Sequence, residues 1–278
     1  MKMKRLVLLG AVLAGGMAMA AEPGKPRLSV FHNHVADMAK AKEISIPEAV
    51  KRVKALGIEG VEVFDAFDRG EAAEIVAAGL VPSAFIMSAD FAYSDETQKV
   101  ERAFAFIAAH PECRRIMLVP GYAREGDDRA ALWEAMKPRI ARLLDRARKA
   151  NVAVELEDFD SDRAIVGSAA DLRRAFKAFP DLGHVYDTGN YDYFREDALA
   201  ALDEFRPRIG HVHVKDIAKE GPRRAVPAGT GRMPIGEMVR RLVASGYSNW
   251  LTIECFGSDD IGRDIAVSAA YLRSLLAP

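Results

Sequence analysis

The feature that most constrains this chain is a regular alternation of short β-rich runs with longer segments of helical periodicity. After residue 26 this pair of segments recurs eight times without a linker or a change of composition. We expect strands at 27–32, 60–64, 81–87, 115–119, 152–157, 183–187, 210–214 and 250–254. Helices are expected from residue 46 and at 72–78, 99–109, 132–149, 169–179, 198–205, 236–244 and 263–276.

This alternation implies parallel strands that are joined by helical crossovers. Eight uninterrupted units favour a closed barrel, because an open sheet usually interrupts the pattern. A (β/α)8 barrel typically uses about 250 residues, and the chain has 278. The sequence therefore predicts an α/β fold that consists of a single (β/α)8 TIM barrel.

The N-terminal segment has the three-part layout of a secretory signal peptide. Lys2, Lys4 and Arg5 form a cationic start, residues 6–19 are uncharged and apolar, and small residues at 18 and 20 offer a cleavage site. The apolar run is short for a membrane span, although an uncut N-terminal anchor is the alternative. We expect a signal peptide at 1–20, a barrel domain at 21–278, and an exported protein, periplasmic or secreted, with no membrane segment after cleavage.

Charge and cysteine content bound the partners of the protein. The chain has 39 basic and 40 acidic side chains, for a formal net charge of −1. It lacks the basic excess that binds a phosphate backbone, so no nucleic-acid partner is expected. Cys113 precedes one expected strand and Cys255 follows another at the opposite rim, so we expect two separate thiols. A homo-oligomer is compatible with the sequence, which does not define the assembly.

Ionisable residues stand at the C-terminal ends of four consecutive expected strands: Glu157, Asp187, His213 and Glu254. Active sites of (β/α)8 barrels are built at this end of the strands. Each residue alone is commonly a solvated loop residue or a hydrogen-bonded core residue. Three carboxylates and one imidazole that converge would repel one another unless a cation lay between them. The set predicts one divalent metal ion, with Mn²⁺, Mg²⁺ or Co²⁺ the best match to oxygen-rich ligands and Zn²⁺ a further option.

The chain resembles the xylose isomerase-like barrels, a group that includes sugar phosphate isomerases and epimerases and hydroxypyruvate isomerases. The resemblance covers nearly all of the expected mature chain, and its clearest parts are residues 152–159, 187–190, 211–216 and 253–254. It implies the same four metal ligands. Spacing from the strand start favours Glu157 over Glu155 and His213 over His211.

The mechanism that the resemblance implies is proton transfer at a carbon beside a carbonyl group of a small carbohydrate. Glu157 and Glu254 would be the catalytic pair, one removing the proton and the other returning it. Lys215 shares the face of His213, so it either binds a substrate oxygen or forms a salt bridge with a neighbouring acid such as Asp216.

Further substrate contacts are expected from Asn190, His34 and Glu62, although His34 also fits a capping or surface role. The chain departs from the pattern of many epimerases at two positions, with Asn190 where they have His and Lys219 where they have Arg. In the family both positions usually contact substrate, so these departures bear on the identity of the substrate more than on metal binding. The alternatives to an isomerase or epimerase are a metal-dependent lyase that acts on a keto-glycoside, a non-catalytic sugar-binding barrel, and a metal-dependent endonuclease, which the net charge disfavours.

Overall fold

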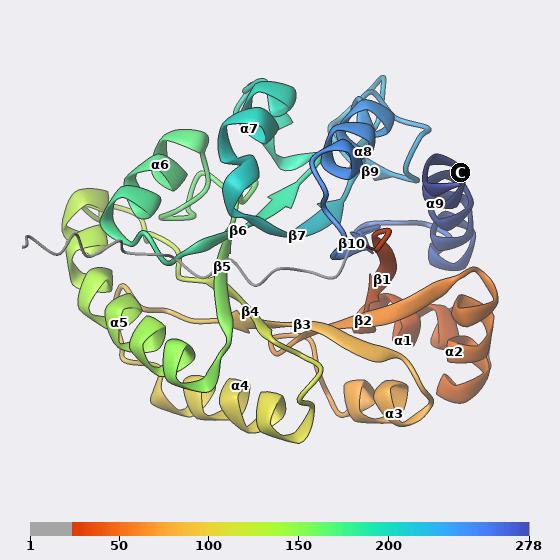
Figure 1. Ribbon diagram of the computed structural model, residues 1–278, viewed down its shortest axis with the longest axis horizontal. Coiled ribbons are helices and arrows are strands. Elements are labelled where there is room, and N and C mark those ends of the chain that lie inside the picture. Colours follow the sequence, from red (N-terminus) through yellow and green to blue (C-terminus); the bar gives the residue numbers. More distant parts are fainter. Residues whose placement is uncertain (1–23, 278) are drawn as a thin grey trace, which may run out of the picture.

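A computed structural model describes residues 24–277 and shows eight parallel strands that close into a barrel (Figure 1). Around the barrel the strand order is β1, β10, β7, β6, β5, β4, β3, β2. The predicted single (β/α)8 barrel is therefore confirmed. The strands are β1 (Arg27–Phe31), β2 (Ile58–Phe64), β3 (Val81–Ser88), β4 (Arg115–Val119), β5 (Ala153–Glu157), β6 (Gly183–Asp187), β7 (Ile209–Val214) and β10 (Trp250–Ile253).

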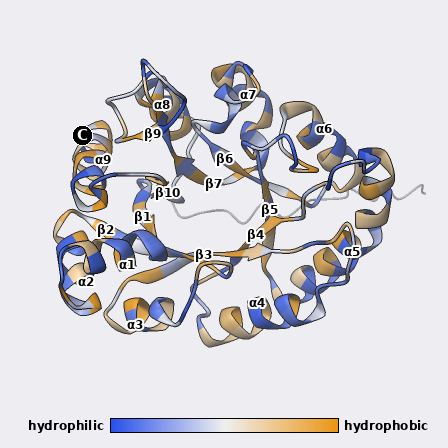
Figure 2. Cartoon of the chain, turned by 180° about the vertical axis from the view of Figure 1, so that it is seen from behind, coloured by the Kyte–Doolittle hydropathy of each residue, from blue (hydrophilic) through white to orange (hydrophobic). Residues whose placement is uncertain are grey.

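Helices form an outer ring around these strands, as Figure 1 shows. Their apolar faces pack against the strands, so that polar and apolar residues alternate along each helix in Figure 2. The α-helices are α1 (His32–Ala41), α2 (Ile46–Ala55), α3 (Glu71–Ala77), α4 (Thr97–Ala109), α5 (Arg129–Ala150), α6 (Ala169–Ala178), α7 (Ala198–Phe205), α8 (Ile235–Ala244) and α9 (Ile261–Leu276). Short 3-10 turns lie at Asn190–Asp192 (η1) and Arg206–Arg208 (η2).

Two elements were not expected from the sequence. Helix α1 begins at His32, directly after β1, where we expected His32 to end a strand and the next helix to start at Ile46. A two-stranded antiparallel hairpin, β8 (Asp216–Ile217) and β9 (Ala225–Val226), lies between β7 and α8. Both elements lie beyond the C-terminal ends of their strands, where they border the site described below.

The interior of the barrel is divided between apolar and ionisable side chains. A small apolar cluster consists of Phe31, Ile86, Met117, Val119 and Val185. Strand register places these residues beside inward-facing ionisable residues, since Phe31 pairs with Glu62, Met117 with Glu155 and Val185 with His211. Alternate residues of a strand face the same side, so Val185 and Asp187 both point inward from β6.

Cys113 and Cys255 are both buried and free, as expected. The expected signal peptide lies outside the described residues. Among residues 24–277, no helix combines the length and apolar character that crossing a membrane requires.

Candidate metal centre

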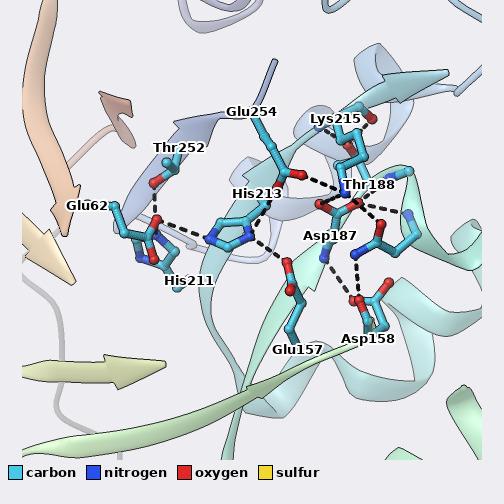
Figure 3. Close-up of polar contacts among 12 residues, drawn as sticks. Glu62, Glu157, Asp158, Asp187, Thr188, His211, His213, Lys215, Thr252 and Glu254 are labelled. Carbon is cyan, nitrogen blue, oxygen red and sulfur yellow. Dashed lines mark hydrogen bonds and ion pairs between the residues drawn. The ribbon is translucent and has the colours of Figure 1, made fainter. Parts of the chain in front are cut away.

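Four ionisable side chains meet at the C-terminal ends of neighbouring strands. Glu157 ends β5, Asp187 ends β6, His213 lies in β7 and Glu254 directly follows β10. All four are buried, and one potential ligand atom from each lies within 4.8 Å of the others. Figure 3 shows that they converge on one place. The structure thus brings together all four residues that the sequence singled out as metal ligands.

Asp187 supports a cation at this place. Its Oδ1 accepts hydrogen bonds from the backbone N–H groups of Gly189 (2.7 Å) and Asn190 (2.8 Å). Its Oδ2 is buried without a hydrogen-bond partner among the described residues, an arrangement that native proteins rarely leave unsatisfied. Burial raises the pKa of Asp187 to about 7, and burial likewise raises the pKa of Glu157 to about 7. A divalent ion between these oxygens would satisfy the orphan atom and favour the ionised carboxylates.

His213 presents one ring nitrogen to the acidic group and the other to the barrel interior. Its Nδ1 lies 2.5 Å from Glu157 Oε1 and 3.5 Å from Glu254 Oε2. Its Nε2 lies 3.0 Å from Oε2 of Glu62. Burial opposes the charged imidazolium, but the carboxylates of Glu62 and Glu157 outweigh burial and hold the pKa of His213 well above its usual value.

Glu62 lies on the interior side of His213, and the substrate contact that we expected of it stays a prediction. Its side chain is fully buried, and one oxygen lies 3.0 Å from Nε2 of both His211 and His213. Burial alone would raise its pKa, but the two imidazoles lower it. Glu62 therefore supports His213 from beneath.

His34 has a structural role, and the substrate contact that we expected of it stays a prediction. It lies in α1 with an exposed fraction of 1%. Its Nε2 accepts a hydrogen bond of 3.0 Å from the backbone N–H of Cys255, the residue after Glu254. Burial lowers the pKa of His34 to about 3, so the ring stays neutral and keeps this acceptor near neutral pH. His34 thereby fixes the chain that carries Glu254.

Lys215 joins the ligand group directly. Its Nζ lies 2.6 Å from Glu254 Oε1 and 3.6 Å from Asp187 Oδ2. Burial disfavours the charged ammonium, but the surrounding carboxylates, Asp187 first, raise its pKa well above the usual value. Asp216, the other partner that we considered, instead accepts backbone hydrogen bonds from its own hairpin and the following loop, including that of Gly231 (2.8 Å). Lys215 thus forms a salt bridge, as one of the two expectations had it. Because this salt bridge lies within the site, it is compatible with the other expected role, binding of a substrate oxygen.

Asn190 links Lys215 to β5. Its Oδ1 accepts a hydrogen bond of 2.7 Å from Lys215 Nζ, and its amide nitrogen donates to the carbonyl oxygen of Asp158 at 2.7 Å. The side chain is 2% exposed. Any contact of Asn190 with substrate would have to share these two partners. Lys219, the other departure from the family pattern, is exposed in the β8–β9 loop.

Two supporting residues were missed by the sequence reasoning. Asp158 Oδ1 accepts a hydrogen bond from the backbone N–H of Asp187 (2.9 Å), and burial raises the pKa of Asp158 well above its usual value. The Thr188 hydroxyl donates to the carbonyl oxygen of Lys215 and accepts from its backbone N–H. Each directly follows a predicted ligand, and strand alternation predicts that such a residue faces away from the site.

This constellation matches a known family. The family model described as "Xylose isomerase-like TIM barrel" matches residues 50–275. This chain belongs to the xylose isomerase-like TIM barrel family. The matched range includes the ends of β5, β6, β7 and β10, and therefore all four candidate ligands.

Three similar proteins have low sequence identity to this chain. A putative hydroxypyruvate isomerase from Streptomyces coelicolor is 33% identical over 95 residues, 34% of this chain and 30% of its own length. The structure of 3-keto-D-glucoside 4-epimerase from E. coli has a TM-score of 0.68 at 18% identity, covering 90% of this chain and 99% of that one. A xylose isomerase-like TIM barrel protein from Mycobacterium smegmatis, in complex with magnesium, has a TM-score of 0.64 at 17% identity, covering 83% and 87%. The two structures show the shared fold.

Proposed function

We propose that the protein is an exported, divalent-metal-dependent sugar isomerase or epimerase. Its reaction is proton transfer at a carbon beside the carbonyl group of a small carbohydrate or keto-sugar. The observation that carries the proposal is the convergence of Glu157, Asp187, His213 and Glu254, with Asp187 Oδ2 buried and without a hydrogen-bond partner among the described residues. The family and the activities named for its relatives support the same reaction class.

The donor set suits one hard divalent cation. Three carboxylates and one imidazole favour Mn²⁺, Mg²⁺ or Co²⁺, with Zn²⁺ also accommodated. When bound, such an ion would polarise substrate oxygens and offset the negative charge that develops as a C–H proton leaves. The magnesium complex of the Mycobacterium smegmatis protein supports this assignment by analogy of fold.

Within the site, Glu157 and Glu254 form the proton-transfer pair. Glu157 Oε1 and Glu254 Oε2 face His213 Nδ1. Glu157 Oε2 and Glu254 Oε1 are then the atoms available to take and return a proton. Lys215 Nζ, 2.6 Å from Glu254 Oε1, favours the ionised form of that carboxyl and lies where it can donate to a substrate oxygen.

The test combines metal content with proton exchange. The purified protein should contain about one divalent ion per chain, and Asp187→Asn and His213→Ala should reduce that content. In D₂O, the metal-loaded protein should exchange the C–H proton beside the carbonyl of a keto-sugar, and Glu157→Gln and Glu254→Gln should abolish exchange. Glu59→Gln is the matched control because Glu59 is an exposed carboxylate of β2.

Failure of the wild-type protein to take up Mn²⁺, Mg²⁺, Co²⁺ or Zn²⁺ would contradict the metal assignment. Metal binding without exchange on any keto-sugar would contradict the catalytic assignment and favour a sugar-binding barrel. Exchange that ends in loss of a substituent would identify a lyase, which shares the first proton transfer.

A further inference from the structure

A continuous row of aromatic rings leads away from the candidate metal centre. The ring of Phe31 lies 5.0 Å from that of His213, and Phe256 lies 5.4 Å from Phe31. Phe67 follows at 5.8 Å from Phe256, and Phe64 lies 4.6 Å from Phe67. We call Phe31, Phe64, Phe67 and Phe256 the aromatic strip. Its members come from β1, β2, the loop after β2 and the segment after β10.

The aromatic strip reaches from the buried interior of the barrel to the surface. Phe31 is 2% exposed, Phe64 and Phe256 are half-buried, and Phe67 is 47% exposed. Among the described residues, Val243 is the other large hydrophobic residue with an exposed side chain. Phe67 differs from an isolated surface residue because it continues an apolar surface that reaches a metal ligand. Such surfaces at the mouth of a site indicate where a ligand binds.

There is room beside this surface. A cavity of about 210 Å³ adjoins one ring of the strip, Phe256, and its other walls come from α1 and the β10–α9 segment, including His34, Asp37 and Ser258. Phe256 is thus an aromatic wall of this cavity, and the acids, Lys215 and Asn190 lie at the ends of β5, β6 and β7.

The cations near the ligand group are already neutralised. Lys215 is paired with Glu254 at 2.6 Å. Arg223 is paired with Asp160 at 2.8 Å and with Asp192 at 3.3 Å. A phosphate group at either cation would have to displace a carboxylate, and it would meet the remaining acids at close range.

We propose that the aromatic strip is a substrate subsite for the apolar substituent of an uncharged keto-sugar. The substrate class is a keto-glycoside with an apolar aglycone, and sugar phosphates are excluded. This inference rests on the proposed function, because the metal centre would hold the sugar ring while the aromatic strip receives the aglycone. Stacking of an aglycone ring on Phe67 would bury apolar surface that is now in water, an effect worth roughly tenfold in affinity.

The experiment compares binding of three probes to the metal-loaded protein by calorimetry: phenyl β-D-glucoside, methyl β-D-glucoside and glucose 6-phosphate. The phenyl glucoside should bind about tenfold more tightly than the methyl glucoside. Phe67→Ala should reduce this ratio to near one and leave the affinity for methyl glucoside unchanged. Val243→Ala is the matched control, since it removes the other exposed apolar side chain and lies near the C-terminal end of α8, and it should preserve the ratio.

Three results would overturn the subsite. These are an unchanged ratio in Phe67→Ala, binding of neither glucoside, and tighter binding of glucose 6-phosphate than of methyl glucoside. Dissociation of a wild-type dimer by Phe67→Ala, measured by sedimentation, would also overturn it and assign the aromatic strip to a second copy of the chain. Proton exchange without the phenyl preference would contradict the subsite alone. The phenyl preference without exchange on any keto-sugar would contradict the proposed reaction and leave the subsite standing.

Discussion

At the scale of single residues, Glu62 is the acid that joins the two histidines of β7. A carboxylate oxygen only accepts hydrogen bonds, and Glu62 Oε2 lies 3.0 Å from Nε2 of both His211 and His213. His213 therefore carries a proton on Nε2. Its Nδ1 is thereby directed toward Glu157, as the proposed metal ligation requires, and Glu62 is a positioning residue.

Glu62→Gln tests this orientation. Glutamine has the shape of glutamate but offers one neutral acceptor and two N–H donors, so it cannot hold both imidazoles equally well. We expect Mn²⁺ affinity to fall about 10- to 100-fold, measured by calorimetric titration, with the fold intact by circular dichroism. Glu59→Gln in the same strand should keep the wild-type affinity. Equal affinity of Glu62→Gln and wild type would show that Glu62 does not position His213.

We expect His184 to make the stability of the protein depend on pH. Its ring is fully buried between Leu156 O (2.9 Å) and the Tyr191 hydroxyl (3.1 Å), and burial lowers its pKa to about 4. Below about pH 6.5 the His184 ring binds a proton in the unfolded chain but stays neutral in the folded chain until the pH approaches 4. The stabilisation is complete above pH ~6.5 and is lost as pH falls toward 4, by up to about 3 kcal/mol.

This effect is isolated by comparing wild type with His184→Gln in urea unfolding at pH 7 and pH 5. The wild type should lose more unfolding free energy than the variant over this interval, because the variant lacks the titrating ring. Parallel losses would show that His184 does not contribute to acid sensitivity.

At the scale of elements, the regular units were predictable and the irregular ones were not. The expected bounds of β4, β6 and α7 agree with the structure because each has a clean apolar pattern and clear flanking residues. Helix α1 was missed because it starts on Phe31 without a side-chain cap and opens with polar residues. No local signal therefore separates α1 from the strand before it.

The site was predictable to the extent that strand alternation determines it. Period two places the four ligands on the inner face at one end of the barrel. Strand alternation could not show that Glu62 contacts His211, 149 residues away in the sequence. Nor could it show that His34 accepts a hydrogen bond from the backbone of Cys255, 221 residues away. These contacts arise from closure of the barrel, and local sequence patterns carry no information about them.

Gly210 in β7 allows an ion pair to lie across the end of the barrel opposite the candidate site. A Cβ at this position would overlap Glu155 Oε1 and Arg115 Nη1, which form an ion pair whose carboxylate is buried. Gly210→Ala should lower the free energy of unfolding by about 1–3 kcal/mol, measured by chemical denaturation. Gly236→Ala, whose Cβ in α8 would meet the hydroxyl end of Tyr271, is the control and should be tolerated. An unchanged transition midpoint in Gly210→Ala would contradict this packing argument.

At the scale of the whole molecule, strand order assigns two tasks to two arcs of the barrel. β5, β6, β7 and β10 are contiguous and supply the candidate metal ligands. β1, β2 and the loop after β2 supply Phe31, Phe64 and Phe67 of the aromatic strip. Phe256 follows β10, which pairs directly with β1. The pairing of Arg27 with Trp250 joins the two arcs where the first and last strands meet.

Export should not disturb this closure. We expect cleavage after residue 20, and β1 begins at Arg27, so the strand that closes the barrel remains complete. When the full chain is expressed in a bacterium with its own N-terminus, the exported fraction should have a mass and N-terminal sequence that begin at Ala21. A protein that stays in the membrane with Met1 intact would identify an uncut anchor instead.

The separation of the two arcs has a consequence for how the substrate range of this barrel can change. Substitutions at Phe64 and Phe67 alter the wall that faces the substituent, while the strands that hold the candidate ligands keep their register. Laboratory selection for a new substrate should therefore accumulate changes at Phe64 and Phe67, in the first third of the chain, and at Phe256. Variants selected in this way should retain the metal content of the parent, whereas selection for a different metal should act on the four candidate ligands and on Glu62, which positions His213.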